Sequence, residues 1–134
     1  MARNITAGPT LTQTPNTRSA LQAIQNDVNN RSRDARRLIG SEAVAKLRAP
    51  STSQVNVDTG LMRRSYLSKV AGGNNRIDIF NTARSKNGFH YPLHVEKKYG
   101  GVARTLRTQR RSIVRNVERR LKRKVPSGRM RNEL

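Results

Sequence analysis

The chain has 134 residues, with 28 Lys or Arg against 8 Asp or Glu, so its formal net charge at pH 7 is +20. This length accommodates one domain, and 34% hydrophobic residues with three Tyr, two Phe and no Trp predict a small core. The absence of cysteine excludes disulfides and thiol catalysis. Such an excess of like charge repels itself, so we expect a polyanion or an acidic protein as partner.

The first 16 residues combine threonine, proline and asparagine with few apolar side chains. Because this composition offers little apolar surface to bury, we interpret residues 1–16 as an extended arm that a neighbouring molecule orders. The rest of the chain is expected to form one α+β domain over 17–125 and a short basic tail over 126–134. No signal-like or membrane-spanning apolar run is seen, and we expect synthesis and use in the cytoplasm, away from membranes.

A long helix is expected to follow the arm. Ser19 and the next three residues fit a capping box, and apolar side chains then recur at a helical period as far as Leu47. Gly40 is a possible weak point in this helix. Pro50 should end it, because a proline disfavours the helical conformation of the residue before it.

The middle of the chain changes to an alternating pattern, which is typical of strands. Residues 66–70 and 76–80 are short β-type runs, and the Ala-Gly-Gly-Asn-Asn sequence between them favours a hairpin turn. In the second run Ile77 and Ile79 should share one face, opposite Asp78 and Phe80.

The last expected helix covers residues 103–124 and is strongly basic. Its apolar stripe consists of Leu106, Ile113, Val117 and Leu121. Residues 101–134 contain 12 basic and 2 acidic residues, so their net charge of +10 is half of the total. The complete prediction is an α+β fold, in which a long N-terminal helix and a basic C-terminal helix pack on a small, mostly antiparallel sheet.

The cations of this helix are the main candidate functional residues. Because the apolar stripe must face the core, most of them must point outward, toward a DNA channel or toward an acidic protein partner. Contact with DNA would be non-specific, through phosphates. The predicted face consists of Arg107, Arg110, Arg111, Arg115, Arg119, Lys122 and Arg123.

Catalytic and metal sites are not predicted. His90 and His94 stand four residues apart with Glu96 nearby, but Pro92 lies between them and no further ligand is evident. No serine lies in a Gly-x-Ser-x-Gly elbow and no glycine-rich phosphate loop follows a strand. We therefore expect no enzymatic activity, no metal and no cofactor.

Two segments together resemble a known family. Residues 49–65 read Ala-Pro, a polar insertion, and then Val-Asp-Thr-Gly-Leu-Met-Arg-Arg-Ser. They resemble the "Pro…Asp-Thr-Gly-x-Leu-x-x-Ser" signature of the neck and tail-completion proteins of tailed phages, which include the minor tail protein Z group. In that family a long helix precedes the signature, and strands, a "Tyr-Ala-x-x-Val-Glu-x-Gly" segment and a C-terminal helix follow. Residues 91–100 correspond to the second segment, with Pro92 in place of the small residue and with Lys-Lys-Tyr, where the pattern has a single residue, before the glycine.

The resemblance spans residues 20–125 and implies structural roles for its motif residues. Asp58 or Thr59 can cap the following turn, and Gly60 permits a tight backbone. Glu96 is one of few acids, and either an arginine of a neighbouring subunit or an intrachain group is its expected partner. The motif residues are Pro50, Asp58, Thr59, Gly60, Leu61, Ser65, Tyr91, Val95, Glu96 and Gly100.

The function implied by the resemblance is that of a virion structural protein. It would form a ring of six subunits, or of twelve, at the head–tail junction, and would assemble in the host cytoplasm. The ring would join the head-closure or connector proteins to the tail-terminator or tail-tube proteins and let double-stranded genomic DNA pass. One alternative is a small basic nucleic-acid-binding protein of ribosomal or nucleoid type. Another, within phages, is a tail-terminator or head-closure ring.

Overall fold

The structure is a computed structural model, and it describes residues 10–28, 33–55, 60–71, 76–84 and 91–129. Within these residues the fold is α+β, as expected, with six α-helices, one 3-10 helix and a two-stranded antiparallel sheet. The elements in chain order are η2 (Leu11–Gln13), α1 (Pro15–Asp27), α2 (Arg33–Arg48), α3 (Gly60–Arg64), β1 (Tyr66–Ala71), β2 (Arg76–Asn81), α4 (Pro92–Tyr99), α5 (Gly101–Thr108) and α6 (Arg110–Arg129).

The expected long N-terminal helix is two helices. The first begins four residues before Ser19, with Pro15 in its first turn, where a proline is well tolerated. It ends at Asp27, because Val28 has an extended backbone and is fully buried. The regular spacing of apolar residues continued past this point and therefore predicted one helix where the chain makes two. Pro50 does follow the end of α2, as expected.

The hairpin is confirmed, with Tyr66 opposite Asn81 and Val70 opposite Ile77. One face of the sheet, which includes Ile77 and Ile79, packs on α2. Gly40 is the point of closest approach, since a Cβ there would lie 2.7 Å from Ser68 Oγ. The expected weak point of the helix is therefore a contact point with the sheet.

Residues 10–16 differ from the expected free arm. Thr10 forms an isolated antiparallel bridge with Phe80, and Leu11 is completely buried in the core. The hydroxyl of Thr12 donates a 3.4 Å hydrogen bond to the buried carboxylate of Asp78. The segment covers the sheet face opposite α2, and the burial of Leu11 helps to anchor it there. Residues 1–9, the rest of the expected arm, lie outside the described residues.

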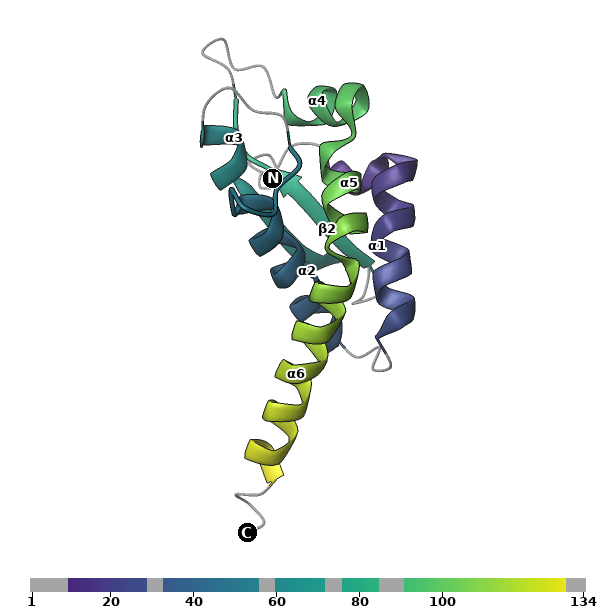
Figure 1. Ribbon diagram of the computed structural model, residues 1–134, viewed down its shortest axis with the longest axis vertical. Helices are drawn as coiled ribbons and strands as arrows, with labels where there is room; N and C mark the ends of the chain where they lie inside the picture. Colours follow the sequence, from purple (N-terminus) through teal and green to yellow (C-terminus); the bar gives the residue numbers. More distant parts are fainter. Residues whose placement is uncertain (1–9, 29–32, 56–59, 72–75, 85–90, 130–134) are drawn as a thin grey trace.

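The C-terminal part is two consecutive helices rather than one spanning 103–124. The first starts at Gly101, and the backbone departs from helical geometry only at Gln109 before α6 continues to Arg129. Helix α5 packs on α1, and α6 packs on α2. Figure 1 shows α6 continuing well beyond the body of the molecule. The helix also runs through 126–129, the first residues of the expected tail, whereas 130–134 lie outside the described residues.

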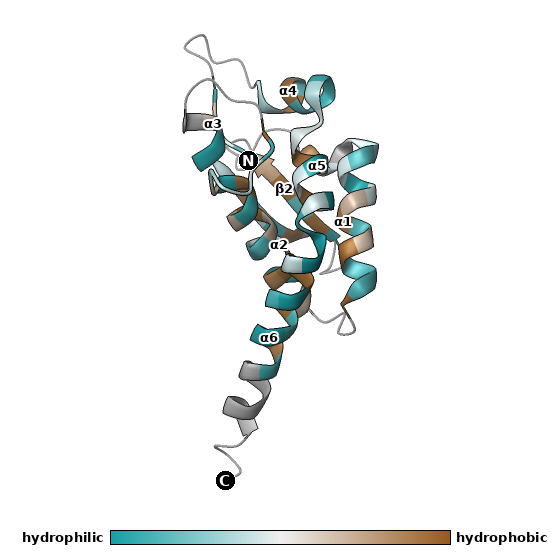
Figure 2. Cartoon of the chain, in the orientation of Figure 1, coloured by the Kyte–Doolittle hydropathy of each residue, from teal (hydrophilic) through white to brown (hydrophobic). Residues whose placement is uncertain are grey.

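Figure 2 shows hydrophobic segments gathered where α2, β2, α1 and α5 face one another, and hydrophilic segments along much of α6. The predicted apolar stripe is in place, because Leu106, Ile113 and Val117 are fully buried and Leu121 packs partly buried against the same core. One side of the basic helix is therefore fixed by packing, as expected.

Candidate interface for an acidic or nucleic-acid partner

The exposed side of α6 carries a row of cations. Arg111, Arg115 and Arg119 follow one another at intervals of four residues, and Lys122 comes three residues later. All four are exposed. At 1.5 Å per residue the row is about 16 Å long. Because it lies on the side of the helix opposite Ile113 and Val117, its charges point away from the core.

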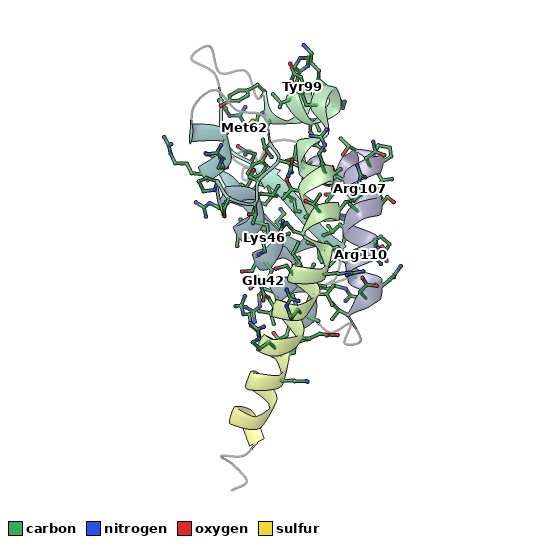
Figure 3. All side chains as sticks on the ribbon, in the orientation of Figure 1. Glu42, Lys46, Met62, Tyr99, Arg107 and Arg110 are labelled. Carbon is green, nitrogen blue, oxygen red and sulfur yellow. The ribbon has the colours of Figure 1, made fainter. Side chains whose placement is uncertain are left out.

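Two further cations of the C-terminal helices are held by acids of the same chain. Arg110 forms a bidentate pair with Asp27 at the end of α1, with N–O distances of 2.6 and 3.0 Å. The hydrogen bond lowers the pKa of the Asp27 carboxyl and raises the pKa of Arg110. Arg120 pairs with Glu42 of α2 at 2.9 Å, and Figure 3 shows Glu42 beside α6 and Arg110 at the start of α6.

One of these two ion pairs involves a residue of the predicted cationic face. Arg107 is exposed on α5. Arg110 belongs to the predicted face as well, but it serves to join α6 to α1. The side chain of Arg123 lies outside the described residues. The continuous row on α6 is therefore formed by Arg111, Arg115, Arg119 and Lys122.

The row borders a shallow concave surface of about 530 Å³. Three of its lining residues, Asp27, Val114 and Glu118, were not predicted as part of the face. Val114 is half-buried and packs against the core, and Glu118 is a half-buried acid among the cations. The surface is lined by Asp27, Arg111, Val114, Arg115, Glu118, Arg119 and Lys122.

At the opposite end of the molecule, Glu96 of α4 is a buried structural acid. Its carboxylate accepts hydrogen bonds from the backbone amides of Val102 and Ala103 at 2.7 and 3.1 Å. The hydroxyl of Thr17 in α1 donates to it at 3.1 Å. Helix α5 has a glycine as its N-cap and no cap from its own side chains, so the carboxylate of the preceding helix satisfies these amides. Of the two expected partners for Glu96, the intrachain one is present, as backbone amides and a hydroxyl.

The second motif segment forms α4 and its two ends. Tyr91 is the N-cap and is half-buried against the core, as is Val95. Gly100 has a positive φ of 67° and joins α4 to α5. The next glycine, Gly101, lies close to the chain after α2, since a Cβ there would be 2.7 Å from Val55 Cα.

The first motif segment is only partly described. Pro50 is exposed in the turn after α2, and Gly60 begins α3. Ser65 lies between α3 and β1, where its backbone N–H donates to the carbonyl oxygen of Met62 at 3.2 Å. Asp58, Thr59 and the side chain of Leu61 lie outside the described residues.

Met62 corrects the reading of the signature. In the signature's spacing it is Met62, rather than Leu61, that stands at the leucine position, and its side chain is 2% exposed. Its carbonyl oxygen also accepts a 2.7 Å hydrogen bond from the buried side chain of Asn81. The residue at the signature's leucine position is therefore a buried methionine.

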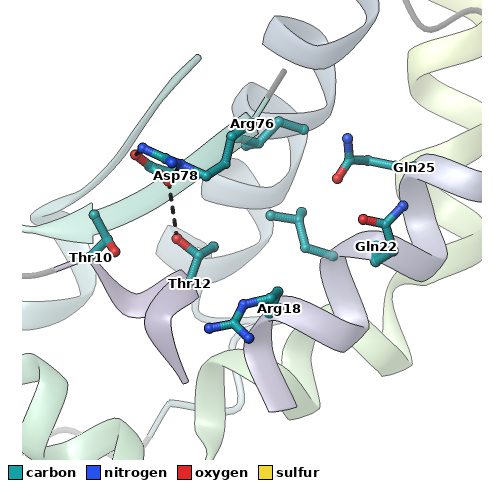
Figure 4. Close-up of a pocket in the computed structure, with 9 residues that line it drawn as sticks. Thr10, Thr12, Arg18, Gln22, Gln25, Arg76 and Asp78 are labelled. Carbon is teal, nitrogen blue, oxygen red and sulfur yellow. Dashed lines mark hydrogen bonds and ion pairs between the residues drawn. The ribbon is translucent and has the colours of Figure 1, made fainter. Parts of the chain in front are cut away.

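A second concave surface, of about 440 Å³, lies between η2, α1 and β2 (Figure 4). Its charged centre is internally neutralised, because Arg76 contacts both carboxylate oxygens of Asp78 at 2.9 and 3.3 Å. Gln22 and Gln25 contribute amide groups from α1. We interpret this surface as the seam along which residues 10–14 pack on the sheet.

The structure bears on two other expectations. Within the described ranges no three His, Cys, Asp or Glu side chains gather as metal ligands; His94 is exposed on α4, and His90 lies outside these ranges. None of the described helices is long and apolar enough to span a membrane. Helix α4 starts directly at Pro92, which takes the first helical position instead of interrupting the helix.

Comparisons with protein-family models, with curated proteins and with solved structures find no match to this chain.

Proposed function

We propose that this chain is a virion structural protein of a tailed bacteriophage, which forms a homo-oligomeric ring at the head–tail junction. The order of the elements supports this proposal. Helices α1 and α2 precede the Asp-Thr-Gly segment, the hairpin follows it, and α4 precedes a basic C-terminal helix. This is the order found in the neck and tail-completion family that the chain resembles.

The observation that carries the proposal is the placement of charge. Helix α6 has one apolar side that fixes it to the body and one cationic side, and it extends beyond the body (Figure 1). A helix extending in this way is well suited to reach a neighbouring molecule. Its cations would contact either passing DNA or an acidic neighbouring ring, and neither contact requires catalytic residues.

A small basic nucleic-acid-binding protein of ribosomal or nucleoid type is the second candidate. The net charge of +20 favours it, because phosphate contacts supply much of the affinity of such proteins. It offers no explanation for the two motif segments. Within phages, a tail-terminator or head-closure ring remains compatible with the same features.

Negative-stain imaging and native mass measurement of the full chain, at low and at high salt, test the proposal. Subunits with this charge repel one another strongly at low salt, and salt shortens the range of that repulsion. We therefore expect rings of six or twelve copies to form as the salt concentration rises. A chain that stays monomeric at every salt concentration and binds any duplex in a salt-sensitive manner would contradict the ring and favour the second candidate.

A further inference from the structure

We propose that the concave surface of α6 binds an acidic helix of a different protein, rather than DNA or a second copy of this chain. The inference rests on the proposed function, in which a neighbouring ring or tail component is the partner, and it names the chemistry of that partner. Three observations carry it. They are the acidic and apolar residues that lie among the cations, the pairing of the chain's own acids, and the four-residue spacing of the arginines on α6.

The mixture of residues on the surface favours a protein over DNA. Glu118 lies on the same concave surface as Arg111 and Arg115, and its carboxylate would repel a phosphate backbone that followed the row. Val114 adds an apolar contact at the same place. An apolar centre within a charged rim is the usual arrangement of a protein interface, whereas interfaces with DNA are more uniformly cationic.

Most acids of the chain are already paired within the chain, which argues against a second copy as the partner. Asp27, Asp34, Glu42 and Asp78 are held in ion pairs, and Glu96 is buried under the start of α5. Among the acids in the described ranges, only Glu118 shows neither a hydrogen bond nor an ion pair. Another copy would therefore bring many cations and few available carboxylates to this row.

The spacing of the row identifies the complementary shape. Arg111, Arg115 and Arg119 repeat every four residues, so successive charges stand about 6 Å apart along the axis. A partner helix with carboxylates at the same four-residue interval presents charges at the same spacing. The complementary helix would also carry an apolar residue facing Val114 and a lysine facing Glu118.

Binding of two probes to the isolated full chain tests this assignment. One probe is a synthetic helical peptide with a row of glutamates at four-residue spacing, a leucine, and one lysine placed to face Glu118. The other is a 20-base-pair duplex of arbitrary sequence. The triple reversal Arg111→Glu, Arg115→Glu, Arg119→Glu should weaken peptide binding about tenfold or more. The matched control Arg64→Glu, Lys97→Glu, Lys98→Glu has the same total charge and should weaken it far less, within about threefold.

A double-mutant cycle locates the contact at Glu118. Glu118→Lys is combined with a peptide in which the lysine is replaced by glutamate. The cycle cancels the effect of overall charge, and a coupling of about threefold or more in favour of the swapped pair is expected. If the triple reversal perturbs folding, as circular dichroism would reveal, the same three arginines changed to glutamine provide the second test.

Three outcomes would overturn the assignment. The first is duplex binding that falls selectively with the α6 reversal while peptide binding does not, which identifies DNA as the partner. The second is equal loss with the α6 reversal and with the control, which leaves only a solvated cationic face. The third is self-association that the α6 reversal abolishes, which identifies a second copy. Rings that form through another surface leave peptide binding on α6 unchanged, so a failure of this assignment can be told apart from a failure of ring formation.

Discussion

The two ends of the molecule use charge in opposite ways. At the α4–α5 end, Glu96 is buried and its carboxylate accepts three hydrogen bonds. These bonds connect α4 with α1 and α5. On α6, the row that begins at Arg111 is exposed. In a chain with so few acids, most of the described acids are already bonded to groups of the same chain. In the function proposed above, the exposed cations of α6 would contact another molecule.

The largest expected effect comes from removing the buried acid. Glu96→Ala leaves the amides of Val102 and Ala103 and the Thr17 hydroxyl without an acceptor. We expect the free energy of unfolding to fall by about 2–4 kcal/mol. Urea unfolding, followed by circular dichroism, measures this loss.

The matched control for that variant is Lys97→Ala, the exposed neighbouring residue on the same helix, which should change stability by no more than about 0.5 kcal/mol. Glu96→Gln retains one acceptor oxygen and should fall between the two. If Glu96→Ala and the control were equally stable, the contrast between the two ends would be wrong.

A smaller effect is expected at the glycine pair between α4 and α5. In Gly101→Ala the new Cβ would lie 2.7 Å from the Val55 Cα and 2.8 Å from the Gln54 carbonyl oxygen, which are backbone atoms. Their displacement should destabilise the protein by about 1–3 kcal/mol. Gly100→Ala meets no atom within 4 Å but retains the positive φ of 67°, so a loss of about 1 kcal/mol is expected. Thermal unfolding of both variants measures these losses. A lower melting temperature for Gly100→Ala than for Gly101→Ala would contradict the close approach of Gly101 to the backbone at Val55.

The smallest effect on stability is expected at the exposed ion pair between Asp27 and Arg110. The hydrogen bond from Arg110 lowers the pKa of Asp27 below its ordinary value of 3.8. The pair therefore stabilises the folded chain fully above that ordinary value, and the contribution disappears as the pH falls through the lowered pKa. Because both groups are solvent-exposed, the contribution is modest.

Unfolding of the wild type and of Asp27→Asn across the pH range measures this contribution. The difference between them should be constant near neutral pH and vanish in strong acid. Arg110→Gln should abolish the same pH-dependent difference, since it removes the other partner. A difference that persisted unchanged to about pH 2 would show that the ion pair is not its source.

Much of the architecture could be predicted because it depends on local patterns. The alternation around Ile77 and the Gly-Gly-Asn-Asn turn predicted the hairpin, and the spacing of Ile113 and Val117 predicted which side of the last helix is buried. Other features could not be seen locally. Apolar spacing continues across Val28, and only the extended backbone at that residue ends α1. The burial of Leu11 depends on β2, which lies far away along the chain.

The sequence alone determined the excess of positive charge, its concentration in the last quarter of the chain, and the apolar stripe that turns those charges outward. These properties follow from residue types and their spacing along one helix. Only the tertiary structure decided which charges are available. Asp27 and Glu42 meet Arg110 and Arg120 across more than seventy residues of sequence, and Glu96 lies beneath the start of another helix. Which groups become partners depends on how whole helices pack, because a side chain can bond only to groups that the fold brings within hydrogen-bonding distance.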